Sequence, residues 1–152
     1  MSARDDGPAA AQVQLRYYQE EAFAAVRYDF SMGGLAALLV LATGCGKTMT
    51  ALSMAAATVR RGGRVLWVAH RSELVNQPLE AWRGLAQFHG AGEAGIVQGG
   101  TDDVGAAVIF ASTGTIARGA TEEGGRLGRI FDGADSPIRM VVIDECLPAG
   151  TP

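Results

Sequence analysis

Apolar residues follow two different patterns along this chain, and the patterns predict alternating helices and strands. Over residues 14–28 they recur every three or four positions with charged residues between them, which is typical of an amphipathic helix. Residues 35–42 instead form a continuous apolar run, the pattern of a strand buried on both faces. The chain therefore begins with a predicted helix followed by a predicted strand.

The same alternation continues to the end of the chain. Further strands are predicted at residues 64–69, 96–97, 106–111 and 138–143. Helices are predicted over residues 47–61, over residues 72–88 with a kink or restart at Pro78, and over the glycine-interrupted residues 115–130. Strands that alternate with helices indicate an α/β fold, a mainly parallel sheet flanked by helices with right-handed crossovers.

Composition narrows the class of protein. The 152 residues suit one domain, and 48% hydrophobic with 19% charged residues excludes a disordered or collagen-like chain. A net charge of -3 gives no bulk attraction for nucleic acid, and two cysteines exclude a disulfide-stapled scaffold. No apolar run approaches the ~20 residues that cross a bilayer, so we expect a cytoplasmic protein without a membrane partner. Residues 1–12 are predicted to be a disordered tail.

A glycine-bearing turn lies between the predicted strand at 35–42 and the predicted helix at 47–61. Gly44 and Gly46 allow backbone N–H groups to close around phosphate oxygens, and a helix N-terminus adds positive potential. In such a loop Lys47 reaches the terminal phosphates and the Thr48 hydroxyl ligates magnesium. The general motif has a glycine where this chain has Leu41, so a chance glycine-rich turn is the alternative.

An acidic pair completes the predicted site. Asp144 and Glu145 directly follow the strand predicted at 138–143. There one carboxylate would hold magnesium through water and its neighbour would activate the attacking water. A solvated acidic pair at a strand end is the alternative.

Four segments in order make the chain resemble superfamily 2 helicases and translocases, in the branch of DEAH-type helicases and restriction-enzyme motor subunits. Residues 41–48 resemble the first motif of that branch, and residues 15–19 resemble its upstream Leu-Arg-Pro-Tyr-Gln element, with Tyr17 replacing the proline. Residues 66–77 are similar to motif Ia. Residues 110–118 are similar to an Ala-Thr-x-Gln-Thr-Leu segment, with Gly114 replacing the glutamine.

The resemblance implies a RecA-like ATP-binding domain over residues 13–145, with ATP and Mg²⁺ as cofactors. Its partner would be single- or double-stranded nucleic acid, DNA in preference to RNA. Lys47, Asp144 and Glu145 would be catalytic, and Thr48 and Asp144 would hold magnesium. Gln19 would read adenine, and the nucleotide-binding residues would be Gln19, Thr43, Gly44, Cys45, Gly46, Lys47 and Thr48.

The resemblance also implies a groove for one nucleic-acid strand. Its residues would be His70, Arg71, Ser112 and Thr115, which would contact the phosphate backbone independently of sequence. Taken one at a time these residues have simpler interpretations. Arg71 would be solvated near a helix start, and Ser112 or Thr115 would cap the following helix.

Family members continue after the acidic pair into a second RecA-like domain, so we expect an N-terminal fragment with an incomplete sheet and weak or absent activity alone. Residues 146–152 resemble the start of an intein, with Cys146 as the splicing nucleophile that attacks the Glu145 carbonyl. The chain would then be the host part of an intein-interrupted helicase precursor. Alternatively, Cys146 is the third residue of the acidic motif and the tail is divergent.

Two other functions remain open at this stage. A non-catalytic nucleotide- or nucleic-acid-binding fragment is the main alternative to a motor domain. A small phosphate-loop kinase is disfavoured because Asp144 and Glu145 are adjacent and no acceptor lid is evident. Cys45, beside a helix N-terminus, is expected to form thiolate readily, although a small buried residue without special reactivity explains it equally well.

Overall fold

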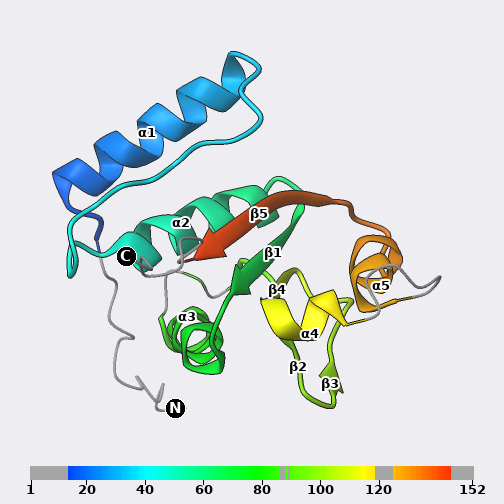
Figure 1. The fold of residues 1–152 in the computed structure, drawn as a ribbon. Helices are drawn as coiled ribbons and strands as arrows, with labels where there is room; N and C mark the ends of the chain where they lie inside the picture. Colours follow the sequence, from blue (N-terminus) through cyan, green and yellow to red (C-terminus); the bar gives the residue numbers. More distant parts are fainter. Residues whose placement is uncertain (1–13, 86–87, 89, 119–124, 145–152) are drawn as a thin grey trace, which may run out of the picture.

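The structure is a computed structural model that describes residues 14–85, 88, 90–118 and 125–144. These residues form an α/β domain around one mixed sheet (Figure 1). Its helices are α1 (Tyr17–Ser31), α2 (Lys47–Val59), α3 (Ser72–Gly84), α4 (Thr113–Ala117) and α5 (Arg126–Asp132). Its strands are β1 (Arg64–Ala69), β2 (Ala94–Gln98), β3 (Thr101–Asp102), β4 (Val108–Ser112) and β5 (Ile138–Asp144).

Strand β1 has neighbours on both sides. The strand order is β3-β2-β4-β1-β5, and all neighbours run parallel except the antiparallel pair β2 and β3. Every residue of β1 is buried, because the strand has a partner along each edge and helices over each face. The prediction of an α/β fold with a mainly parallel sheet is therefore confirmed.

Alternate side chains of β1 point into two cores on opposite faces of the sheet. Val65, Trp67 and Ala69 pack with buried residues of α2 and α3. Leu66 and Val68 pack on the other face, where Ile130 of α5 is fully buried. The helices therefore form two layers, with α2 and α3 on one face and α4 and α5 on the other.

Most predicted elements are present with shifted ends. The strand at 64–69 is confirmed at both ends, whereas the first helix begins at Tyr17 and ends at Ser31, each three residues later than predicted. Pro78 lies inside α3 without ending it, and the helix stops at Gly84. The stretch 115–130 is not one helix, because α4 ends at Ala117 and α5 begins at Arg126. None of the described helices is long and apolar enough to cross a membrane.

The predicted strand at residues 35–42 is wrong. These residues form neither a strand nor a helix, and Leu35, Leu38 and Val40 are 98%, 79% and 78% exposed. They connect the end of α1 with the start of α2 (Figure 1). A strand exists only where it pairs with a neighbour, and this segment pairs with none of the described strands, although β5 is paired on one side only. An apolar run alone therefore does not bring a segment into the sheet.

Strand β5 lies at one edge of the sheet and is covered on one face only. Met140 and Val142 pack against the α2 and α3 core, and the Thr58 hydroxyl of α2 donates to Met140 Sδ at 3.5 Å. Val141 and Ile143 point to the opposite face and are 48% and 58% exposed. Among the described residues, β5 therefore leaves one strand edge and one apolar face uncovered.

Arg64 at the start of β1 is a buried cation held by backbone carbonyls. It is 3% exposed, and its guanidinium donates to the carbonyls of Val104, Ala106 and Ser136. Burial lowers the pKa of this guanidinium below its ordinary value. The side chain ties β1 to the segments that precede β4 and β5.

Replacing Arg64 is expected to destabilise the fold. In Arg64→Met three carbonyls lose a donor in a buried place, which should lower the free energy of unfolding by ~2 kcal/mol. Urea unfolding followed by circular dichroism measures the change, and Arg61→Met, at an exposed position in the turn before β1, is the matched control. An unchanged unfolding midpoint in Arg64→Met would contradict the assignment.

Candidate functional site

Residues 43–46 form a turn that leads directly into α2, whose first residues are Lys47 and Thr48. Gly44 and Gly46 have φ values of +81° and +77°, and Gly46 is the N-cap residue of α2. Only glycine adopts this left-handed backbone without strain. A Cβ at Gly44 would meet nothing within 4 Å, so the loop is open to a ligand on that side. The first N–H groups of α2 have no intrahelical acceptors, and together with the helix dipole they favour an anion here.

The charged side chain of the loop is exposed. Lys47 is the chain's single lysine and begins α2. Among the described residues its ammonium group has no hydrogen-bond or ion-pair partner. Thr48 follows in the first turn and is half-buried. The helix start thus presents a cation and a hydroxyl beside its backbone N–H groups.

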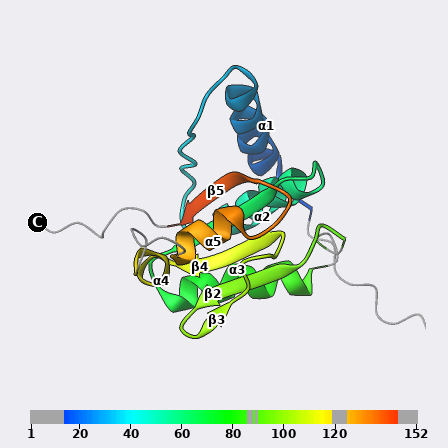
Figure 2. The same cartoon turned by 90° about the vertical axis from the view of Figure 1, so that its right-hand side faces the viewer.

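Gln19 of α1 supports this loop from outside the sheet. The side chain is 6% exposed, and its Nε2 donates to the Cys45 carbonyl at 3.0 Å and to the Gly46 carbonyl at 3.2 Å. Its Oε1 accepts the Arg16 N–H at 2.8 Å. Helix α1 packs beside α2 and stands apart from the sheet (Figure 2). The structure therefore brings Gln19 to the loop, with its amide engaged by loop backbone.

The carboxyl ends of the parallel strands β4, β1 and β5 lie together, and this side of the sheet is called its carboxyl edge. Ala69 of β1 is in register with Ser112 of β4 on one side and with Asp144 of β5 on the other. Helix α2 runs antiparallel to these strands and packs over β1 and β5, so its amino-terminal end reaches this same edge. Figure 1 shows the arrowhead of β5 directed toward that end of α2. The predicted site residues Lys47 and Asp144 therefore share one edge. Glu145 lies outside the described residues.

The four residues predicted to contact nucleic acid lie at the same edge but differ in exposure. His70 and Arg71 are exposed between β1 and α3, and His70 Nδ1 lies 3.5 Å from the Thr113 hydroxyl. Ser112 and Thr115 are buried, and the Ser112 hydroxyl donates to that of Thr115 at 2.8 Å. His70 and Arg71 are thus accessible to a large ligand, whereas the other two hydroxyls satisfy each other.

The loop residues fit a nucleotide with its magnesium ion. Two left-handed glycines, an open side at Gly44 and an exposed ammonium group provide a place for phosphate oxygens. Within the described segments no cluster of three or more His, Cys, Asp or Glu side chains gathers to hold a metal ion. A magnesium ion here would take ligands from Thr48, Asp144, water and the phosphates themselves.

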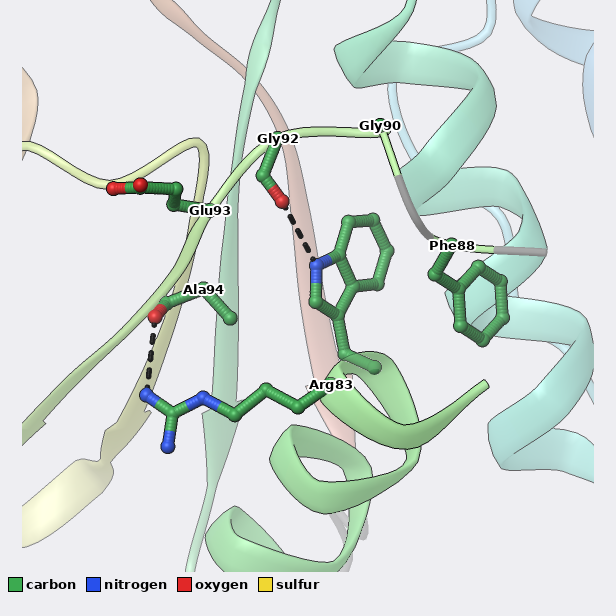
Figure 3. Close-up of a pocket in the computed structure, with 7 residues that line it drawn as sticks. Arg83, Phe88, Gly90, Gly92, Glu93 and Ala94 are labelled. Atoms are coloured by element: carbon green, nitrogen blue, oxygen red, sulfur yellow. Dashed lines mark hydrogen bonds between the residues drawn. The ribbon is translucent and has the colours of Figure 1, made fainter. Parts of the chain in front are cut away.

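A cavity of about 320 Å³ lies at the opposite edge of the sheet, between the end of α3 and the start of β2 (Figure 3). Its main polar groups already have backbone partners. Trp82 Nε1 donates to the Gly92 carbonyl and Arg83 donates to the Ala94 carbonyl, each at 3.2 Å. Ligands of open α/β sheets bind outside the carboxyl ends of the strands. This cavity is therefore not the candidate site.

The fold defines an α/β protein of the RecA-like class. A family profile described as type III restriction enzyme, res subunit, matches residues 12–147. The chain belongs to this family, and its domain is the motor domain of superfamily 2 helicases and ATPases.

Two known proteins illustrate the similarity. The endonuclease subunit of the type I restriction enzyme EcoKI of Escherichia coli K12 is 39% identical over 79 residues, which is 51% of this chain and 7% of that protein. The Sulfolobus solfataricus SWI2/SNF2 ATPase core, solved in complex with double-stranded DNA, superposes with a TM-score of 0.61 and 16% identity. That superposition covers 96% of this chain and 34% of the other, so it shows the fold.

Cys146 and the rest of the predicted intein start lie outside the described residues. The family match runs through residue 147 and so includes Cys146 as part of the motor domain. These comparisons give the intein interpretation no support.

Sequence reasoning did not foresee two contacts. Gln19, for which the resemblance implies a role at adenine, bonds the loop backbone, and Thr113, for which no role was predicted, lies beside His70. The expected glutamine-bearing element drew attention to Gln19, but its position relative to Cys45 depends on how α1 packs on α2. No sequence signal marks Thr113.

Nucleotide is expected to slow alkylation of Cys45. The thiol is half-buried in the loop, between the two glycines, so bound phosphates would cover it. We expect ATP with Mg²⁺ to lower the iodoacetamide rate measured by mass spectrometry in Cys146→Ser, which leaves one thiol. Adenosine is the control because it has no phosphate. Equal rates with and without ATP would contradict the prediction.

Proposed function

We propose that this chain is an ATP-binding domain that couples ATP hydrolysis to movement on DNA in the intact motor. The observation that carries the proposal is the open turn at residues 43–46, whose two left-handed glycines precede α2 and its exposed lysine. The chain spans 7% and 34% of the two proteins described above, so the activity of the whole motor is part of the proposal.

Each residue of the loop has a defined task in this proposal. Gly44, Cys45 and Gly46 turn backbone N–H groups toward the phosphates, and Thr43 begins the turn. Lys47 neutralises the terminal phosphates, while Thr48 and Asp144 orient a magnesium ion, which offsets charge on the transferred group. Glu145 activates the attacking water.

DNA is the proposed macromolecular partner. Both proteins compared above are named for DNA-directed work: one is a restriction endonuclease subunit and the other is an ATPase core solved with double-stranded DNA. His70 and Arg71 are the exposed candidates for contact with the phosphate backbone at the carboxyl edge of the sheet. Ser112 and Thr115 would contribute only if their mutual hydrogen bond opened.

Two finer alternatives stay open to test. A non-catalytic nucleotide-binding fragment shares the loop but turns over no ATP. The intein hypothesis for residues 146–152 is a prediction from seven residues, which the coding sequence beyond Pro152 tests directly.

Loss of the lysine is expected to abolish most ATP affinity. Lys47→Ala removes the one side-chain cation of the loop, and the lost charge-assisted hydrogen bonds correspond to an affinity loss of about 10- to 100-fold. Isothermal titration with ATP and Mg²⁺ measures it. Arg61→Ala, an exposed cation beyond the other end of α2, is the matched control. An unchanged dissociation constant in Lys47→Ala would refute the assignment of the loop.

Arg71→Ala is expected to weaken DNA binding equally for all sequences. Removing one phosphate contact should reduce the slope of log affinity against log salt by about 1. Fluorescence anisotropy with two unrelated duplexes, with Arg61→Ala as control, measures this. ATP turnover with and without the duplexes then distinguishes a motor from the non-catalytic alternative. A salt slope unaffected by Arg71→Ala would remove this residue from the DNA interface.

A further inference from the structure

One carboxylate of β3 holds two arginine side chains of α5. Asp102 Oδ1 lies 3.1 Å from Arg126 Nε, and Asp102 Oδ2 lies 2.6 Å from Arg129 Nη2. The two arginines are three positions apart, so they project from the same face of the helix. Arg126 Nη2 also donates to the Gly99 carbonyl at 2.7 Å. Because two guanidinium groups meet one carboxylate, this cluster keeps one positive charge that Asp102 does not neutralise.

The cluster lies at the carboxyl edge of the sheet. Strand β2 runs parallel to β4, with Val97 in register with Ala111, so β2 ends beside the end of β4. Gly99 follows β2 directly, and its carbonyl is the one that Arg126 binds. Neighbouring strands are about 4.8 Å apart, so the end of β2 lies about 10 Å from the end of β1, which Arg71 follows.

The arginines retain exposed surface and hydrogen-bond donors. The Arg129 side chain is 48% exposed, against 24% for Arg126 and 25% for Asp102. A guanidinium carries five N–H donors, and among the described residues Arg129 bonds Asp102 through Nη2. Arginine presents its donors as a planar fork that matches the oxygens of a phosphate. The cluster thus has charge and donors for a second anion.

From this arrangement we propose that Arg126 and Arg129 form a second contact for a DNA phosphate, and that Asp102 occupies them while no DNA is bound. This inference rests on the proposed function, in which DNA is the partner at the carboxyl edge. Each DNA strand carries one charge per 3.4 Å of the helix axis, so about 10 Å corresponds to about three nucleotides. A strand that contacts Arg71 therefore reaches the arginine pair.

A purely structural ion pair explains the cluster less well. Ion pairs with this much exposure add little to stability, and a single arginine is enough to attach α5 to the hairpin of β2 and β3. The second arginine, Arg129, is the more exposed of the two. Its charge serves a partner from solution better than it serves the fold.

The first test is Asp102→Asn, which keeps the shape of the side chain and removes the competing charge. We expect its affinity for a DNA duplex to rise by about fivefold, which is the equilibrium effect of one exposed ion pair. The slope of log affinity against log salt should steepen by about 1, because one more phosphate is neutralised. Asp135→Asn, an exposed aspartate before β5, changes the net charge equally and is the matched control. Equal affinities of the two variants would overturn the proposal.

The second test removes an arginine at the surface. Arg129→Gln should reduce the salt slope by about 1, and the double variant Asp102→Asn/Arg129→Gln should lose most of the affinity gained by Asp102→Asn. Arg61→Gln is the control for loss of an exposed cation. A gain that persists undiminished in the double variant would overturn the assignment of the arginines. Urea unfolding of each variant separates loss of binding from loss of fold.

Failure of this inference differs from failure of the proposed function. If Arg71→Ala alters the salt slope but Asp102→Asn and Arg129→Gln do not, DNA remains the partner and the cluster only ties α5 to the hairpin. If the wild-type chain binds no duplex even at low salt, the proposal of a DNA partner fails, and this inference fails with it.

Discussion

The need to cover both faces of β1 organises this domain. Each residue of the strand is buried, with Trp67 directed to one core and Leu66 to the other, so helices must lie on both sides of the sheet. Parallel neighbours then place the strand ends together, and α2 packs over β1 and β5 on one face. The loop at the start of α2, the end of β5 and the exposed His70 and Arg71 meet at one edge as a result of that arrangement.

The candidate nucleotide loop is supported from an unexpected side. The segment before it, residues 35–42, is exposed and outside the sheet, so its shape is not set by a preceding strand. The support comes from α1, whose one buried residue, Gln19, bonds the loop carbonyls. Helix α1 has few other buried contacts. The hydrogen bonds of Gln19 therefore attach it to the domain at the place where the chemistry is proposed to occur.

The two outer strands of the described sheet, β3 and β5, differ in the contacts that hold them in place. At the β3 end, Asp102 bonds Arg126 and Arg129 of α5 at 3.1 Å and 2.6 Å, which attaches that helix to the short hairpin. At the other end, β5 has one partner strand, and Val141 and Ile143 are exposed on one face. Exposed alternate apolar residues on an edge strand are an open surface for further association.

Local sequence signals determined much of this protein. The apolar run at 64–69 gave a strand with the predicted ends, and the glycine pattern at 44–46 located the loop, because left-handed backbone and helix starts are properties of a few adjacent residues. Only the tertiary structure decided that residues 35–42 stay outside the sheet and that Gln19 reaches Cys45, 26 positions away. The physical reason is that a strand exists only with a partner, and a side chain is committed only by what packs against it. Both depend on residues far away in the sequence, which no local pattern records.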